Sequence, residues 1–163
     1  MSRTRRPART ATALLVAAAG ALGLAACAPA MTEHEYSPSD GVRVDLTDQL
    51  RGVNLLVVAA AQGDEGALQG ALVNNTASAE TFTLTAEGAS PVTLTVDPST
   101  TVYLGGEDGE KLTLDTVSQA PGAFVKATLE AGQQTKEFEL PVLDGTLSEY
   151  QSLIPSPSPS PSN

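Results

Sequence analysis

The feature that most constrains the fold is a series of short segments in which apolar residues alternate with polar ones, often with Thr. In an extended strand this alternation places every second side chain on one face. Turn signals rich in Gly, Pro and Asn separate the segments at intervals of roughly 8–12 residues. The segments cover 42–46, 55–61, 81–85, 92–96, 102–104, 112–114, 125–129 and 137–142.

No long segment repeats its apolar residues at the helical period. We therefore predict an all-β fold: an antiparallel, immunoglobulin-like β-sandwich of seven to nine short strands. The continuous apolar run 55–61 predicts a central strand covered on both faces. Pro91 and Pro141 predict strand starts or edges. The Cys and Trp of true immunoglobulin domains are absent from this part of the chain, so only the architecture is implied.

A short helical turn is predicted after the last strand. Thr146-Leu147-Ser148-Glu149 has the pattern of a capping box, and the apolar residues that follow recur at helical spacing. Such a turn either packs over one end of the sandwich or serves as an apolar docking peptide for a partner.

The N-terminal residues have the composition of a secretory signal. Four Arg residues lie within the first nine positions, and a thirteen-residue apolar run, 11–23, follows them. A membrane-spanning helix needs roughly 20 apolar residues. We therefore expect a cleaved signal helix at 1–26.

The end of this signal, Leu24-Ala25-Ala26-Cys27, resembles the lipobox of bacterial lipoproteins. The resemblance implies that Leu24, Ala25 and Ala26 are recognised by the signal peptidase. It also implies that Cys27 receives a diacylglyceryl group and becomes the first mature residue. Two acyl chains anchor a protein durably, whereas one does so marginally. An ordinary cleaved signal in which Cys27 has no such role is the alternative.

The charge divides at the same point. After residue 26 the chain has five cationic and nineteen acidic residues, 5 − 19 = −14. Such a surface repels nucleic acid and anionic lipid headgroups. We expect a lipid-anchored tether at 27–40 and one β domain at 41–154. A Ser-Pro tail follows at 155–163, either a cell-wall spacer, a glycan-bearing tail or an inert disordered end.

The search for chemistry gives mainly exclusions. His34 is the only His and lies in the tether, and acylation would remove Cys27 as a nucleophile, so we predict no enzyme and no cofactor. Glu107-Asp108-Gly109-Glu110 is expected in a Gly-rich hairpin loop, as a solvated turn or a weak divalent-cation site. Asn74-Asn75-Thr76 matches a glycosylation sequon by coincidence and is expected to form a tight hairpin turn.

Four segments together resemble a family of small actinobacterial lipoproteins, the LpqE-type. They are His34–Val42, Asn54–Val58, Gly70–Asn75 and Pro141–Tyr150, and the likeness covers about residues 27–155. The resemblance implies an immunoglobulin-like sandwich on the outer face of the cytoplasmic membrane, with no established activity. Some members look distantly related to PCu(A)C copper chaperones, which bind Cu(I) through Met and His. Here only Met31 and His34 remain after cleavage, and both lie in the tether.

We therefore expect a monomeric, non-catalytic binding or scaffolding module, anchored to the bilayer through acylated Cys27 and engaging an envelope protein. The alternative is a copper- or metal-handling accessory lipoprotein that uses Met31 and His34. The β domain itself supplies no Met or His for such a site.

Overall fold

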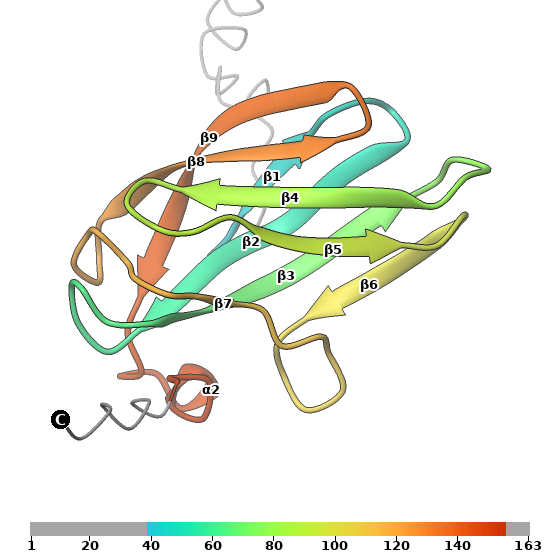
Figure 1. The fold of residues 1–163 in the computed structure, drawn as a ribbon. Coiled ribbons are helices and arrows are strands. Elements are labelled where there is room, and N and C mark those ends of the chain that lie inside the picture. Colours follow the sequence, from blue (N-terminus) through green and yellow to red (C-terminus); the bar gives the residue numbers. More distant parts are fainter. Residues whose placement is uncertain (1–38, 156–163) are drawn as a thin grey trace, which may run out of the picture. The chain divides into compact units, whose positions relative to one another are not determined.

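The computed structural model describes residues 39–155, which form nine strands and one short helix (Figure 1). The all-β prediction is confirmed, and the number of strands lies within the predicted range. The elements are β1 (Val42–Asp45), β2 (Leu50–Ala59), β3 (Gly66–Asn74), β4 (Glu80–Ala86), β5 (Val92–Val96), β6 (Thr100–Leu104), β7 (Thr113–Leu114), β8 (Phe124–Ala131), β9 (Gln134–Leu143) and α2 (Ser148–Gln151).

The strands form one curled, mixed sheet. Their hydrogen-bonded order is β5-β4-β8-β9-β2-β3-β6, with β1 on β2 and β7 on β3. Seven of the eight strand pairs within residues 39–155 are antiparallel. The eighth, between β2 and β9, is parallel and pairs Val57 with Val142 and Val58 with Leu143. The expectation of purely antiparallel pairing is therefore corrected.

The parallel pair arises because β9 changes neighbours along its length. Pro141 lies inside β9, buried and opposite Phe124 of β8, one residue before β9 joins β2. Since Pro has no N–H to donate, it suits the point where the ladder changes partner. The prediction that Pro141 marks a strand start or an edge is wrong. Pro91 directly precedes β5, a strand at one end of the sheet, as predicted.

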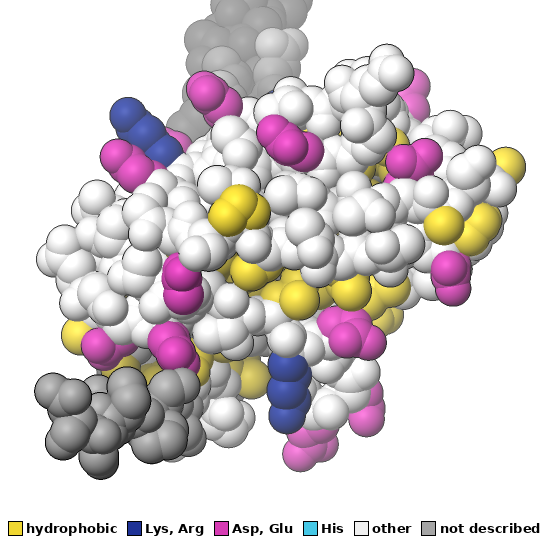
Figure 2. Space-filling view, viewed as in Figure 1, with side chains coloured by type: hydrophobic (Ala, Val, Ile, Leu, Met, Phe, Trp, Pro, Cys, Tyr) yellow, Lys and Arg dark blue, Asp and Glu magenta, His cyan; other side chains and the backbone are white. Residues whose placement is uncertain are grey.

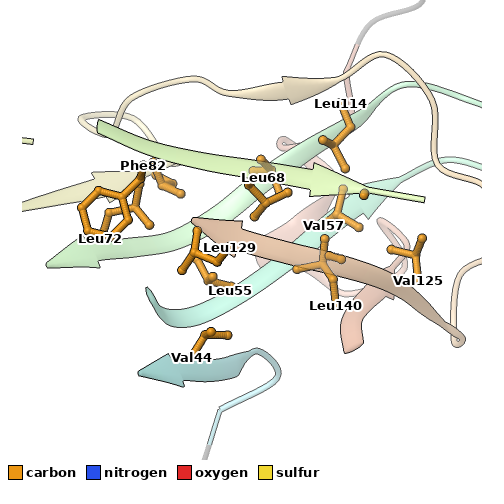
Figure 3. Packing of buried hydrophobic residues seen from close by; sticks show 14 of the residues in the cluster. Val44, Leu55, Val57, Leu68, Leu72, Phe82, Leu114, Val125, Leu129 and Leu140 are labelled. Carbon is orange, nitrogen blue, oxygen red and sulfur yellow. The ribbon is translucent and has the colours of Figure 1, made fainter. Parts of the chain in front are cut away.

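The core lies inside the curl, between β4 and β8 on one side and β2 and β3 on the other. Leu129 and Leu140 come from β8 and β9 and lie among the β2 side chains Leu55 and Val57 (Figure 3). Residues 55–59 are all buried, which confirms a covered central strand there, whereas Ala60 and Ala61 of the predicted run 55–61 follow β2 and are exposed. Full burial of one such aliphatic side chain stabilises the fold by about 1.5–3 kcal/mol.

Two predicted hairpins are not formed. Residues 75–79 connect β3 to β4, and these two strands are not hydrogen-bonded to each other. The predicted turn at Asn74-Asn75 therefore begins a connection between different parts of the sheet, and it is not a hairpin turn. Residues 105–112 connect β6 to β7, and both strands pair with β3. The acidic segment 107–110 therefore lies in a loop between two strands that both pair with β3, and it does not close a hairpin.

The C-terminal segment forms the predicted helical turn, α2, without the predicted capping box. The N-cap residue is Leu147, and no side chain caps the helix. Asp144 instead accepts a hydrogen bond from the Thr146 N–H at 2.9 Å. α2 has no buried residue of its own, and Ile154 packs on Gly145. No helix among the described residues is long and apolar enough to cross a membrane.

Candidate binding surface

The residues that the sequence analysis assigned to specific roles lie outside the described residues. These are the lipobox residues Leu24, Ala25, Ala26 and Cys27 and the candidate metal ligands Met31 and His34. The surface available for a structural account therefore belongs to the β domain.

The described chain begins at the same end of the domain where it finishes. The hydroxyl of Tyr150 in α2 donates a hydrogen bond to Asp40 at 2.6 Å. The Gly41 N–H donates to the side-chain oxygen of Asn54 at 2.8 Å. The hydrogen bond from Tyr150 to Asp40, together with burial and the negative charges of Asp40 and Glu149, raises the pKa of Tyr150 to about 12. The entry to β1 is therefore held against the C-terminal helix.

The acidic residues of the described chain do not gather into a candidate metal site. Among residues 39–155, no three His, Cys, Asp or Glu side chains gather as metal ligands would. The acids Glu107, Asp108 and Glu110 are all exposed, as a solvated segment requires. What the domain does offer is two surfaces with different chemistry.

The first surface is a shallow groove of about 740 Å³ formed by β4, β8 and β9. Lys126 lies opposite Glu139 across the β8–β9 pair, and the Glu87 N–H donates to the Lys126 carbonyl at 2.8 Å. In the next row Thr128 lies between Thr85 of β4 and Glu137 of β9; Thr85, Thr128 and Glu137 also line the groove.

One ammonium group and three carboxylates therefore share this groove. Lys126 makes no salt bridge, since the one salt bridge in the described part of the chain joins Arg43 to Asp45. Hydroxyl, ammonium and carboxylate groups can hydrogen-bond a polar ligand. The groove suits neutral or cationic ligands, because carboxylates outnumber the single cation.

The second surface is the β5–β6 seam, defined by Val92 and Leu94 of β5, Val102 of β6 and Leu112. These four side chains are half-buried and pack against the core. Figure 2 shows a stripe of hydrophobic side chains crossing this face between β5 and β6. Beneath the stripe lies a crevice of only about 10 Å³, lined by apolar residues from both sides of the core. A partner would therefore lie on the seam and not enter the core.

Both ends of the seam are closed. Residues 97–99 connect β5 to β6 at one end. At the other end Asp115, which follows β7, accepts hydrogen bonds from the Ser90 N–H at 3.0 Å and the Ser90 hydroxyl at 2.6 Å. These two hydrogen bonds, the hydroxyl one foremost, lower the pKa of Asp115. The apolar stripe is therefore bounded by the connection 97–99 at one end and by the Ser90–Asp115 contact at the other.

Asn74 is a structural residue whose role the sequence pattern did not reveal. It is fully buried at the end of β3, and its amide donates to carbonyls of Ser78 and Val96. A buried, hydrogen-bonded amide is closed to glycan transfer in the folded domain. The match to the sequon therefore offers no accessible acceptor in the folded domain.

Comparison of the chain with protein-family models gives no match, and comparison with curated proteins gives none either. Function is therefore argued from the lipobox sequence and from the surfaces of the β domain.

Proposed function

We propose that the chain is a bacterial lipoprotein, anchored through Cys27 to the outer face of the cytoplasmic membrane, whose β domain is a non-catalytic binding or scaffolding module. One observation carries the proposal: a lipobox sequence lies thirteen residues before Asp40, where the described chain is first held by a side chain of α2. Thirteen residues span at most about 45 Å, so the domain stays close to the bilayer.

The proposed architecture is an immunoglobulin-like sandwich. Two antiparallel groups support it: β5-β4-β8-β9, and β2-β3-β6 with β1 and β7 at its margins. Their buried side chains meet in one cluster. The parallel contact of β9 with β2 joins the two groups at one side, and the β5–β6 seam lies between them at the other. The family that this proposal favours is the LpqE-type lipoproteins.

The charge of the mature chain supports the central role of the lipid. With a formal charge of −14 after residue 26, the protein has no general electrostatic attraction to an anionic membrane. Durable attachment then depends on the two acyl chains at Cys27. The groove on β4, β8 and β9 and the β5–β6 seam are the surfaces that the anchored domain would present to an envelope protein.

A Cys27→Ala variant tests the anchor, with His34→Ala as the matched control because it changes the tether outside the lipobox. In the bacterial host we expect Cys27→Ala to lose lipid labelling and to leave the washed membrane fraction, while His34→Ala keeps both. Retention of Cys27→Ala in the membrane fraction would show that another segment holds the protein there.

A further inference from the structure

The β5–β6 seam joins the two ends of the strand order. Within residues 39–155, β5 pairs only with β4, so one long side of β5 has no strand partner. β6 pairs with β3, and on its other side only its C-terminal end is occupied, by a parallel bridge between Leu104 and Glu110 in which the Glu110 N–H donates to the Tyr103 carbonyl at 2.9 Å. Backbone N–H and C=O groups along an unpaired strand side, above all that of β5, are free to bond an added strand. Between these two sides lie the half-buried side chains Val92, Leu94 and Val102.

Apart from the bridge to Glu110 at the end of β6, these edges lack the usual protection against strand addition. Proteins commonly guard edge strands with charged residues, internal Pro or bulges. Neither β5 nor β6 contains a charged residue or Pro, and the register of neither strand is interrupted by a bulge. β1, by contrast, is a margin of the same sheet and contains Arg43 and Asp45. Tyr103 adds an aromatic side chain on β6 that is 69% exposed.

The rim of the seam is strongly acidic. Asp97 and Asp115 lie at its two ends. The loop 105–111 runs along one long side of the seam, because the residues that flank this loop, Leu104 and Leu112, both line the crevice. Figure 2 shows acidic side chains in the segment directly below the hydrophobic stripe. The rim holds five acids and one Lys, a formal charge of −4: Asp97, Glu107, Asp108, Glu110, Lys111 and Asp115.

We propose that the β5–β6 seam binds an extended peptide segment of an envelope protein, with alternating apolar side chains and Lys or Arg at its ends. The inference rests on the proposed binding function and assigns it a surface. Alternate side chains of the segment cover the apolar stripe, its backbone bonds a free strand edge, and its cations meet the acidic rim. The charges set partner choice and rate of encounter more than total affinity.

Charge favours a basic peptide over two other occupants. A second copy of the mature chain would bring a formal charge of −14 and the same acidic rim, which like charges disfavour. An anionic lipid surface would meet the same repulsion. A basic segment is the occupant that the rim attracts.

Two labelled synthetic peptides test the proposal against the chain 27–163 carrying Cys27→Ser. Without the apolar segment 11–23 and without an acylated Cys, this protein stays in solution whether or not the anchor proposal holds. One peptide is Lys-Leu-Thr-Val-Thr-Leu-Lys, and the other has Glu in place of both Lys residues. Fluorescence anisotropy should show the Lys peptide binding about tenfold more tightly, with the difference shrinking as salt is added. Equal affinities, or no binding of the Lys peptide at millimolar concentration, would overturn the proposal.

Substitutions on opposite faces of β5 locate the site. Leu94→Lys places a charge in the seam, and Thr93→Lys places the same charge on the exposed face of the same strand. We expect Leu94→Lys to weaken the Lys peptide about tenfold or more and Thr93→Lys to change its affinity less than about twofold. Equal losses would contradict the assignment. So would a dimer in sedimentation that Leu94→Lys dissociates and the peptide leaves intact, because a second copy would then occupy the seam.

A charge-only variant keeps the test independent of any folding defect in Leu94→Lys. Replacing Glu107, Asp108 and Glu110 by their amides changes only exposed side chains. It should weaken the Lys peptide about fivefold. The matched control replaces Asp48, Glu130 and Glu149 by their amides, which removes three charges from exposed side chains outside the seam, its rim and the groove and should leave affinity nearly unchanged. Equal effects of the two triple variants would show that net charge, and not the rim, attracts the peptide.

Discussion

Asn74 is buried at the end of β3, and its side chain connects three segments. Its amide nitrogen lies 2.8 Å from the Ser78 carbonyl, 2.9 Å from that of Val96 and 3.2 Å from that of Asp97. Its carbonyl oxygen accepts from the Thr76 N–H at 2.9 Å. Residues 75–79 and 97–99 cross between different parts of the sheet, so one side chain holds both crossings.

Removing this amide should destabilise the domain strongly. Asn74→Ala leaves buried carbonyls without a donor, and we expect the free energy of unfolding in urea to fall by about 2–4 kcal/mol. The neighbouring Asn75 is exposed, so Asn75→Ala should change it by less than about 0.5 kcal/mol. Similar losses for the two variants would mean that the hydrogen bonds of Asn74 do not hold the crossings.

The contact of Tyr150 with Asp40 should be visible in a pH titration. The pKa of Tyr150 is raised from 10.0 to about 12, so the stability that this hydrogen bond contributes is fully present below pH 10 and is lost as pH rises through the value of about 12. Absorbance of tyrosinate should therefore show a component near pH 12 that Tyr150→Phe removes and Asp40→Asn moves to lower pH. If Asp40→Asn leaves the titration unchanged, the two residues are not paired in solution.

The Ser90–Asp115 contact at the end of the seam predicts acid sensitivity. The pKa of Asp115 is lowered from 3.8 in the folded domain. Its contribution to the free energy of unfolding is therefore present above pH 3.8 and is lost as pH falls through the lowered pKa of the folded domain. The urea concentration at the midpoint of unfolding, measured from pH 6 to pH 2, should decrease below pH 3.8. The decrease should be smaller for Asp115→Asn than for the unchanged protein. An identical pH profile for the two proteins would contradict the contact.

At the level of elements, a bulge in β2 explains the irregular register of the central strands. The β2–β3 register shifts between Val53 and Leu56, where Asn54 has φ +53°. Gly70 of β3 faces this bulge with φ +125°, and a Cβ there would lie 2.6 Å from the Asn54 carbonyl oxygen. The close approach of two backbones requires a residue without a side chain.

Comparing Gly→Ala substitutions at Gly70 and Gly63 separates two costs in the free energy of unfolding. One is the steric clash of the added methyl group, and the other is the strain of a positive φ. Gly70→Ala should lower the free energy of unfolding by about 3–4 kcal/mol, since the methyl group meets backbone atoms. Gly63→Ala is the control: its φ is +90°, but nothing lies within 4 Å of the added atom. It should cost about 1–2 kcal/mol. Equal costs in chemical denaturation would show that the backbones of β2 and β3 do not approach so closely.

The strands that the alternating pattern predicted are those whose faces differ clearly. β8 is the best example, since Val125, Ala127, Leu129 and Ala131 are buried and the residues between them are more exposed. β3 was not predicted as a strand: Gly66, Gly70 and buried Gln69 interrupt its apolar pattern, and both of its faces are largely covered. The parallel contact of β9 also escaped the pattern, because alternation specifies faces and not neighbours.

At the level of the whole molecule, the chain enters and leaves the β domain at one end. Asp40 contacts Tyr150, and β9 reaches α2 after pairing with the end of β2 at Val58. The β8–β9 hairpin, at Ala131 and Gln134, lies at the opposite end of β9.

The acidic charge of the mature chain gives a prediction about membranes. Without residues 1–26 and without its lipid, the chain 27–163 carrying Cys27→Ser should not sediment with vesicles of anionic phospholipid even at low salt, because its formal charge of −14 is repelled. Vesicles of neutral phospholipid are the control and should also leave it in the supernatant. Binding to the anionic vesicles alone would reveal a basic surface that outweighs the net charge.

The lipobox and the β5–β6 seam differ in what sequence alone can say about them. The lipobox is predicted from Leu24-Ala25-Ala26-Cys27 alone, because a local pattern needs only its position and its flanking residues to be recognised. The seam depends on β5 and β6 lying at the two ends of a curled sheet and on the acids that follow them in space. Nothing in the spacing of Leu94 and Val102 shows that they line one surface.

The central claim, a lipid anchor at Cys27, is tested most directly by the mass of the mature N-terminal peptide isolated from bacterial membranes. The account predicts a peptide that begins at Cys27 and carries the added mass of a diacylglyceryl group, with or without a further acyl chain on its amine. An N-terminal peptide that still contains residues before Cys27, or one whose Cys27 is unmodified, would contradict it.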